Sequence, residues 1–81
     1  MRELDRLREE IHDIDLQLME LLEKRTGLVK QVGVYKMARG MEIYVPEVEE
    51  HKIAQLKKYC NCPGLVETIW PVIMCYERSV E

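Results

Sequence analysis

Apolar residues recur along the first half of the chain at alternating steps of three and four positions. They are Leu4, Leu7, Ile11, Ile14, Leu18, Leu21, Leu28, Val32 and Tyr35. This heptad-like spacing predicts one long helix, from about Leu4 to Arg39, with a single buried seam. Gly40 suits the left-handed conformation that often ends a helix. Gly27 and Gly33 each cost roughly 1 kcal/mol inside a helix, which is tolerable where a backbone or ligand approaches closely.

The second half of the chain predicts two shorter helices. Pro46 fits the first turn of a helix that runs to about Tyr59, and the acidic residues after it favour a helix N-terminus. A turn over residues 60–64 leads to a third helix, from about Leu65 to the chain end, in which Pro71 should cause a kink or remove one hydrogen bond. The residues expected to face inward are Val48, Ile53 and Leu56 in the second helix and Leu65, Ile69, Val72, Ile73 and Tyr76 in the third.

These elements define an all-α fold with one long and two shorter helices, and we expect a single domain over residues 1–81. A helix of about 35 residues is roughly 50 Å long, whereas a compact chain of this size has a radius of gyration of about 12 Å. The long helix must therefore extend beyond the rest of its own chain. Its apolar seam needs a partner, and the simplest is the same helix of a second subunit. We expect a homodimer.

Composition narrows the class of partner. A net charge of −3 gives no basic field, so nucleic acid is not an expected partner. The chain has no apolar run with a length of about 18 residues and no signal-peptide pattern. We therefore expect no membrane segment and a cytoplasmic location. The three cysteines, Cys60, Cys62 and Cys75, are odd in number and include a C-x-C pair. This pattern supports neither a disulfide framework nor a zinc site, so we expect reduced thiols and no metal.

Arg25 is the most informative position of the long helix, because it stands on the seam where an apolar residue is expected. An unpaired buried guanidinium is costly, so either a carboxylate of the protein or an anionic ligand must meet it. Lys36 lies three turns later on nearly the same face. Arg8 lies about 100° round the helix from Arg25, so the two do not easily converge in one subunit, but an antiparallel dimer would bring them together. Such cations suit a small dicarboxylate or ordinary ion pairs, and spacing alone leaves both open.

The long helix resembles the first helix of the all-helical chorismate mutases, through the segment LREEIHDIDLQLMELLEKRTGLVKQVGVYK. That family reads approximately L-R-x-x-I-D-x-I-D-x-x-[IL]-x-x-L-[LI]-x-x-R, with V-[AG]-x-x-K further on. His12 stands where the family often has Asp. The matching positions are Leu7, Arg8, Ile11, Ile14, Asp15, Leu18, Leu21, Leu22, Arg25, Val32, Gly33 and Lys36.

The resemblance implies an intertwined homodimer of the chorismate mutase type with two active sites. The implied reaction is the Claisen rearrangement of chorismate to prephenate in aromatic amino-acid biosynthesis, with no cofactor and no covalent intermediate. By resemblance, Arg8 reaches across from the other subunit, Arg25 binds a substrate carboxylate, and Lys36 donates to the ether oxygen and a carboxylate. Such a site would hold the dianion in its reactive conformer and stabilise charge that develops on the ether oxygen.

Three glutamates complete the implied site. Glu49 takes the place of a family glutamate that contacts the ring hydroxyl of the substrate. Glu81 takes the place of a Gln or Glu that hydrogen-bonds the ether oxygen, and Glu77 lies one turn earlier, among the expected substrate-binding residues. A carboxyl group can donate to an ether oxygen only when it is protonated, so a glutamate donor predicts higher activity at lower pH.

The segment also departs from the family pattern. Val45 and Val48 replace a family Asp and Arg, Glu77 stands where a small polar residue is common, and Pro71 lies in the helix that presents Glu81. These departures keep three alternatives open. The first is a 4-amino-4-deoxychorismate mutase, because the ammonium group of its substrate would suit the loss of the arginine beside Glu49. The second is an isochorismate-pyruvate lyase. The third alternative is a non-catalytic helical dimer that acts as a regulatory or interaction module.

Overall fold

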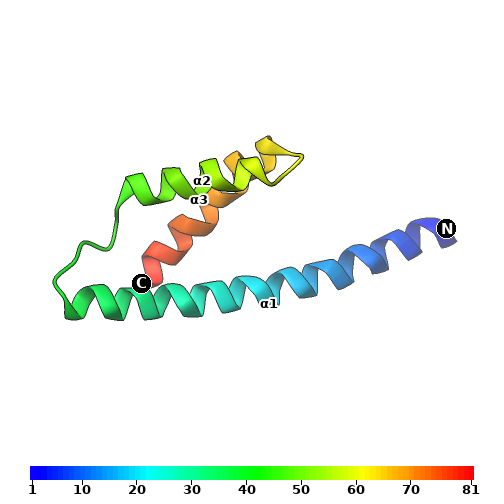
Figure 1. Ribbon diagram of the computed structural model, residues 1–81. Coiled ribbons are helices and arrows are strands. Elements are labelled where there is room, and N and C mark those ends of the chain that lie inside the picture. Colours follow the sequence, from blue (N-terminus) through cyan, green and yellow to red (C-terminus); the bar gives the residue numbers. More distant parts are fainter.

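The computed structural model describes all 81 residues and contains three helices and no strand. They are α1 (Arg2–Ala38), α2 (Pro46–Lys58) and α3 (Pro63–Val80). In Figure 1, α2 and α3 lie over the C-terminal half of α1, whereas its N-terminal half projects beyond them. The predicted all-α class, with one long and two shorter helices, is confirmed.

The helix ends follow local signals in the sequence. α1 ends just before Gly40, whose φ of 64° lies in the left-handed region that glycine adopts without strain. α3 begins at Pro63 rather than at Leu65, because proline has no N–H group to satisfy and fits the first turn of a helix. The turn before α3 is therefore shorter than the predicted residues 60–64. The helix continues through Pro71 to its end.

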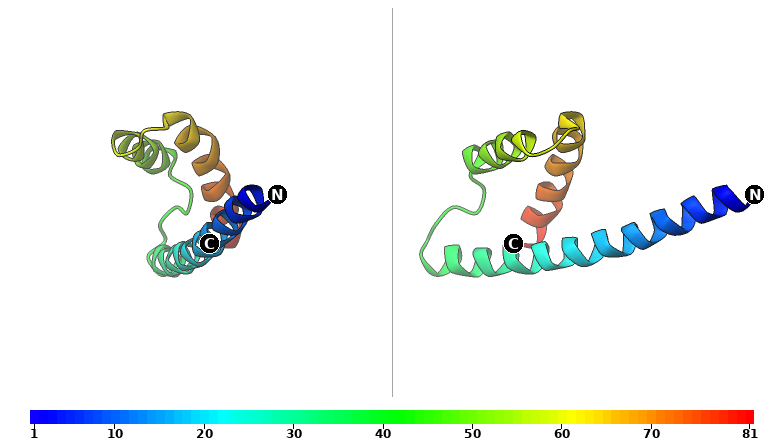
Figure 2. Two further views of the ribbon diagram at one scale, coloured as in Figure 1. Left: turned by 90° about the vertical axis from the view of Figure 1, so that its right-hand side faces the viewer. Right: turned by 45° about the vertical axis from the view of Figure 1, so that its right-hand side comes forward.

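The third helix connects the other two. α3 packs against both α2 and α1, whereas α1 and α2 make no close backbone contact with each other. The end-on view in Figure 2 shows α3 running from α2 to α1. The buried residues of the chain are Gly33 on α1 and Val66, Met74 and Glu77 on α3. A core this small gives one chain little apolar burial to offset the entropy lost on folding.

The prediction of which residues of α3 face inward is largely wrong for a single chain. Four of its five residues are exposed, namely Leu65, Ile69, Val72 and Tyr76. The covered stripe runs beside them, through Val66, Trp70, Met74 and Glu77. α3 carries two neighbouring stripes, and apolar periodicity cannot tell which one meets the chain's own helices. On α2, Ile53 and Leu56 are half-buried as predicted, but Val48 is exposed.

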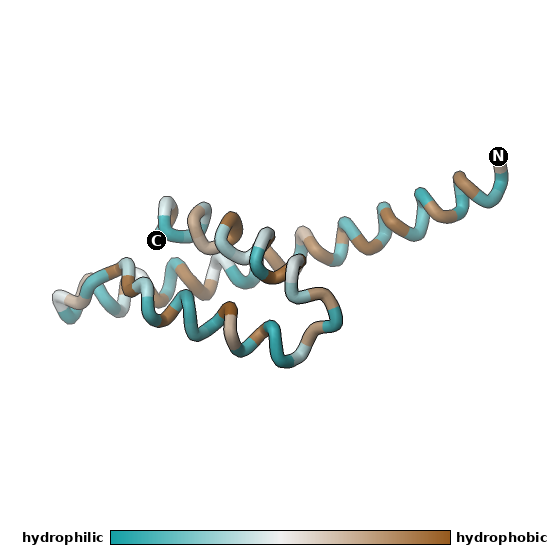
Figure 3. The backbone as a smooth tube through the Cα atoms, turned by 90° about the horizontal axis from the view of Figure 1, so that it is seen from above, coloured by the Kyte–Doolittle hydropathy of each residue, from teal (hydrophilic) through white to brown (hydrophobic).

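The N-terminal half of α1 has no partner within the chain. Every residue from Met1 to Leu21 is exposed, and the molecule is 57 Å long. Its radius of gyration of 16.2 Å exceeds the value of about 12 Å for a compact chain of this size. Apolar positions recur along this half as brown bands in Figure 3. The predicted extension of the helix beyond its own chain is confirmed. No helix combines the length and apolar character needed to cross a membrane.

A close approach occurs at one of the two glycines inside α1. A Cβ built on Gly33 would lie 2.8 Å from Cγ of Glu81 and 3.0 Å from its backbone carbonyl carbon. A Cβ built on Gly27 would meet no atom within 4 Å. Gly33 therefore lets the C-terminal end of α3 rest directly on α1, where Figure 1 places the C-terminus.

Gly33→Ala is expected to lower the free energy of unfolding by roughly 1–3 kcal/mol, because the added carbon forces Glu81 away from α1. Helix propensity alone would favour alanine by about 1 kcal/mol, so the direction of the change tests the contact. Gly64→Ala is the control, since its Cβ would meet nothing within 4 Å. Urea unfolding at a fixed protein concentration measures both variants, and a Gly33→Ala protein as stable as the control would contradict the close approach.

Candidate active site

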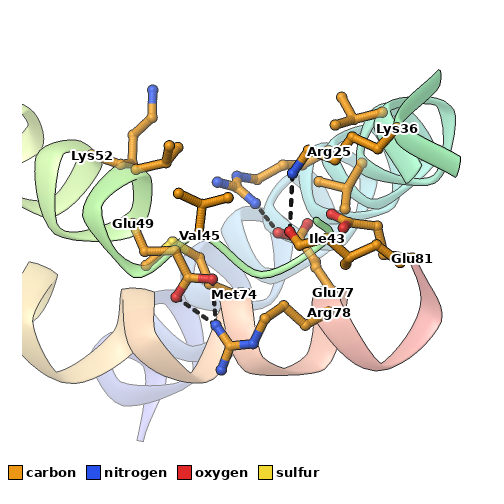
Figure 4. A pocket seen from close by; sticks show the side chains of 13 residues that line it. Arg25, Lys36, Ile43, Val45, Glu49, Lys52, Met74, Glu77, Arg78 and Glu81 are labelled. Carbon is orange, nitrogen blue, oxygen red and sulfur yellow. Dashed lines mark hydrogen bonds and ion pairs between the residues drawn. The ribbon is translucent and has the colours of Figure 1, made fainter. Parts of the chain in front are cut away.

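A cavity of about 170 Å³ lies between α1, α2, α3 and the segment that joins α1 to α2. Figure 4 shows side chains from all these elements around it. Its apolar wall consists of Val29, Val32, Ile43, Val45, Val48 and Met74. Its charged residues are the cations Arg25, Lys36, Lys52 and Arg78 and the acids Glu49, Glu77 and Glu81. A cavity that joins apolar walls to a cluster of cations suits a small organic anion.

Helical spacing explains why these side chains converge. On α1, Arg25 and Lys36 lie eleven residues apart, which is close to three full turns, so both point to one face. On α2, Val48 and Lys52 are separated by one turn. On α3, Glu77 and Glu81 are related in the same way, and Glu77 belongs to the buried stripe of this helix. Each helix therefore presents one short run of its sequence to the cavity.

The Arg25 guanidinium forms an ion pair with Glu77. The Glu77 side chain is 3% exposed, and its second oxygen accepts a hydrogen bond from the Thr26 hydroxyl at 3.3 Å. Arg25 is 31% exposed and lines the cavity. A carboxylate of the protein thus meets the seam arginine, which is one of the two outcomes that the sequence left open. The pair also links the middle of α1 to α3.

A second ion pair lies at the other side of α3. Arg78 donates to both carboxylate oxygens of Glu49 on α2, and its guanidinium carbon lies 4.3 Å from the centre of the Tyr44 ring. The hydrogen bonds to Glu49 raise the pKa of Arg78 above its ordinary value, so this cation stays charged. Arg78 therefore holds Glu49 at the cavity, as the dashed lines in Figure 4 show.

The remaining predicted residues have looser contacts. The Lys36 ammonium donates to the Ile43 carbonyl at 2.9 Å, which holds the connecting segment against α1. Glu81 lines the cavity, and its Oε2 atom is buried without a hydrogen-bond partner. A buried carboxyl oxygen without a partner is costly, so this atom is suited to an incoming ligand.

The structure brings together five of the six residues expected from the sequence. Arg25, Lys36, Glu49, Glu77 and Glu81 all line the cavity. The sixth, Arg8, lies on the exposed half of α1, roughly 25 Å along the helix from Arg25. One chain therefore does not complete the predicted set.

Two cations at the cavity were missed in the sequence, namely Lys52 and Arg78. Helical spacing offered one signal, because Lys52 follows the expected inward residue Val48 by a single turn. Arg78 could be found only from its contact with Glu49, which depends on how α3 meets α2. The chain holds no cluster of three or more metal-ligating side chains.

The chain belongs to the chorismate mutase type II family, whose sequence model matches residues 7–81. It is 38% identical over 76 residues to a T-protein of Enterobacter agglomerans, covering 89% of this chain and 20% of that protein. It is 41% identical over 61 residues to a bifunctional chorismate mutase/prephenate dehydratase of Aquifex aeolicus, covering 72% and 17%. A T-protein of Haemophilus influenzae is 47% identical over 49 residues, covering 60% and 13%.

The chain spans a fifth or less of the length of these curated relatives. No solved structure gives a significant match. Family membership therefore rests on sequence, and the arrangement of the cavity rests on the geometry described above.

Removal of Arg25 is expected to destabilise the fold more than a change at Glu77. Arg25→Met leaves the buried Glu77 carboxylate without its counter-charge, at a cost of about 3 kcal/mol. Glu77→Gln keeps an acceptor for the Thr26 hydroxyl and leaves an arginine that water can reach. Urea unfolding measures both variants.

The double variant Arg25→Met/Glu77→Met is the control for this comparison. It should regain part of the stability lost in Arg25→Met, because no buried charge remains. If Glu77→Gln lowers the free energy of unfolding more than Arg25→Met does, the result would contradict the conclusion that Glu77 is the more buried partner of the pair.

Proposed function

We propose that this chain is a chorismate mutase, which rearranges chorismate to prephenate. The observation that carries the proposal is the ion pair at Arg25: a guanidinium at the cavity wall already binds a carboxylate there. Chorismate is a dicarboxylate with an apolar ring edge, so it needs cations and apolar walls in one small space. Family membership over residues 7–81 supports the same assignment.

The proposed mechanism is positioning and electrostatic stabilisation. The rearrangement breaks one C–O bond and forms one C–C bond within a single molecule, so its chemistry requires no nucleophile and no cofactor. Arg25 would bind a carboxylate and hold the reactive conformer. Lys36 and a protonated Glu81 would donate to the ether oxygen as negative charge develops there. Both side chains lie at the cavity, and the Glu81 carboxyl has an oxygen free for this contact.

Glu77 and Glu49 have supporting roles in this proposal. Glu77 orients Arg25, and a substrate carboxylate must share or replace that contact. Glu49, held by Arg78, would accept a hydrogen bond from the ring hydroxyl of the substrate. Each of these acids is paired in the absence of substrate, which keeps the negative charge of the cavity low.

The active form is proposed to be a homodimer in which Arg8 enters the cavity of the other subunit. The apolar seam of α1 is exposed from Leu4 to Leu21 in one chain, and exposed apolar stripes of this length indicate an interface. A second apolar groove between α1 and α3 is lined by Met19, Leu22, Ile69, Val72, Ile73 and Tyr76 among others. An antiparallel α1 pair centred midway between Arg8 and Arg25 would cover the seam and bring each Arg8 to the other chain's Arg25.

The activity is tested by following the loss of chorismate absorbance. Arg25→Ala is expected to lower kcat/KM by about 10²-fold or more, because it removes the guanidinium that binds a substrate carboxylate. Lys24→Ala is the matched control, since Lys24 is adjacent, exposed and outside the cavity. Wild type is expected to turn over faster at about pH 5 than at about pH 7.5, because only a protonated Glu81 can donate.

The outcomes separate the alternatives. Turnover that is equal in Arg25→Ala and Lys24→Ala would exclude Arg25 from the reaction. Binding of chorismate without turnover, together with turnover of 4-amino-4-deoxychorismate, would favour the amino-substituted substrate. No binding and no thermal shift with a chorismate-like dicarboxylate would identify a non-catalytic helical dimer.

Mixing two inactive variants tests whether Arg8 crosses the interface. Arg8→Ala and Arg25→Ala should each lose activity, but a mixed dimer would contain one site with neither substitution. After unfolding and refolding together, equal amounts should regain up to about a quarter of the wild-type rate. Separately refolded variants are the control. No recovery in a mixture that sedimentation shows to be dimeric would contradict a shared site.

A further inference from the structure

Glu49 is the only acid that α2 presents to the cavity. The neighbouring acids of this helix, Glu47 and Glu50, are exposed and do not line it. In the proposed function, Glu49 meets the substituent on the ring of the substrate. A carboxylate with its full charge at this place would attract an ammonium group more strongly than a hydroxyl group, because a charge-assisted hydrogen bond is the stronger one. The charge that Glu49 retains therefore decides which substituent the cavity accepts.

Arg78 neutralises this carboxylate. A single guanidinium nitrogen, Nη1, donates to both oxygens of Glu49, as the dashed lines in Figure 4 show. The Tyr44 ring lies against the same guanidinium, whose carbon is 4.3 Å from the ring centre. The side chains of Arg78 and Glu49 are 30% and 23% exposed, so water screens their attraction only in part. The carboxylate and the ring together hold the guanidinium in place, and the pair carries no net charge.

The cation beside Glu49 comes from α3 rather than from α2. Val48 precedes Glu49 and brings an apolar side chain to the cavity. In the sequence, the lack of an arginine at that position favoured an ammonium group on the substrate. The structure removes this reason, because Arg78 brings an arginine to the same carboxylate from another helix. No other cation of the chain forms an ion pair with Glu49.

A neutralised carboxylate treats the two substituents differently. A carboxylate has about four lone-pair sites, so Glu49 can accept a hydrogen bond from a hydroxyl group and keep its contact with Arg78. An ammonium group that enters the cavity loses its hydration and needs a counter-charge in return. Glu49 already shares its charge with Arg78, and the guanidinium repels a second cation beside it. The hydroxyl group is therefore the better fit.

We propose that Arg78 determines the specificity of the cavity, because it neutralises Glu49 and so favours a ring hydroxyl group over a ring ammonium group. This inference rests on the proposed function, in which Glu49 meets the ring substituent. Arg78 acts through Glu49 and away from the bond that breaks. The expected preference is for chorismate over 4-amino-4-deoxychorismate.

The test measures kcat/KM for both compounds and takes the ratio of the amino compound to chorismate. Loss of folded protein lowers both values equally, so the ratio reports specificity alone. Arg78→Met leaves Glu49 with its full charge and is expected to raise the ratio about tenfold or more. Arg39→Met is the matched control. Arg39 also lies over a tyrosine, 3.6 Å from the centre of the Tyr35 ring, but it is exposed and outside the cavity. This control should keep the wild-type ratio.

Two further variants test whether the ratio follows the charge of the pair. Glu49→Gln leaves the Arg78 cation without its acid, so the ratio should fall by about threefold or more as the ammonium group is repelled. Glu49→Gln/Arg78→Met removes both charges and should return the ratio to within about threefold of the wild-type value. A change of shape or stability at either residue would not produce this order.

Each result has a distinct meaning. A ratio that rises in Arg78→Met, falls in Glu49→Gln and returns in the double variant supports the inference. If wild type turns over chorismate and Arg78→Met keeps the wild-type ratio, the role of Arg78 is wrong while the proposed function holds. The inference is also overturned if the double variant keeps the raised ratio of Arg78→Met, or if wild type prefers the amino compound. If wild type turns over neither compound, the proposed function fails and the inference fails with it.

Discussion

The ion pair between Arg25 and Glu77 is the contact on which the rest of the structure depends. α3 alone packs against both other helices, and this pair ties it to the middle of α1. Glu77 is almost fully buried, and a buried carboxylate is tolerated only when a counter-charge and hydrogen bonds meet it. Arg25 and Thr26 supply both. The interaction therefore sets where α3 lies, and with it the position of every residue that α3 presents to the cavity.

This arrangement gives the cavity a particular electrostatic character. Two of its cations are already neutralised by acids of the same chain, so a ligand at Arg25 must exchange partners with Glu77 rather than fill an empty site. The net gain from such an exchange is smaller than the attraction of a free guanidinium. Affinity in the proposed enzyme then depends on contacts that require no exchange of ion-pair partners, such as those of Lys36 and of the free oxygen of Glu81.

Sequence reasoning reached the parts of this molecule that depend on local periodicity. The long helix, its extension beyond the chain and the shared face of Arg25 and Lys36 all follow from 3.6-residue spacing. Sequence reasoning failed where burial and ion pairing depend on how the helices pack against one another. α3 has two adjacent apolar stripes, and only its contacts with α1 and α2 determine that Val66 and Met74 are covered. The pairing of Arg78 with Glu49 joins residues far apart in the chain, so no spacing rule predicts it.

The exposed stripe and the incomplete site are two consequences of the same geometry. Because α1 extends beyond α2 and α3, its N-terminal apolar residues are uncovered and Arg8 lies far from the cavity of its own subunit. In the proposed dimer, one antiparallel contact corrects both, because it buries the seam and delivers the missing cation. Stability and catalysis would then share a dependence on protein concentration, since an obligate dimer has no folded monomer that is separately stable. In the proposed dimer, the long helix would supply half of an active site as well as half of a hydrophobic core.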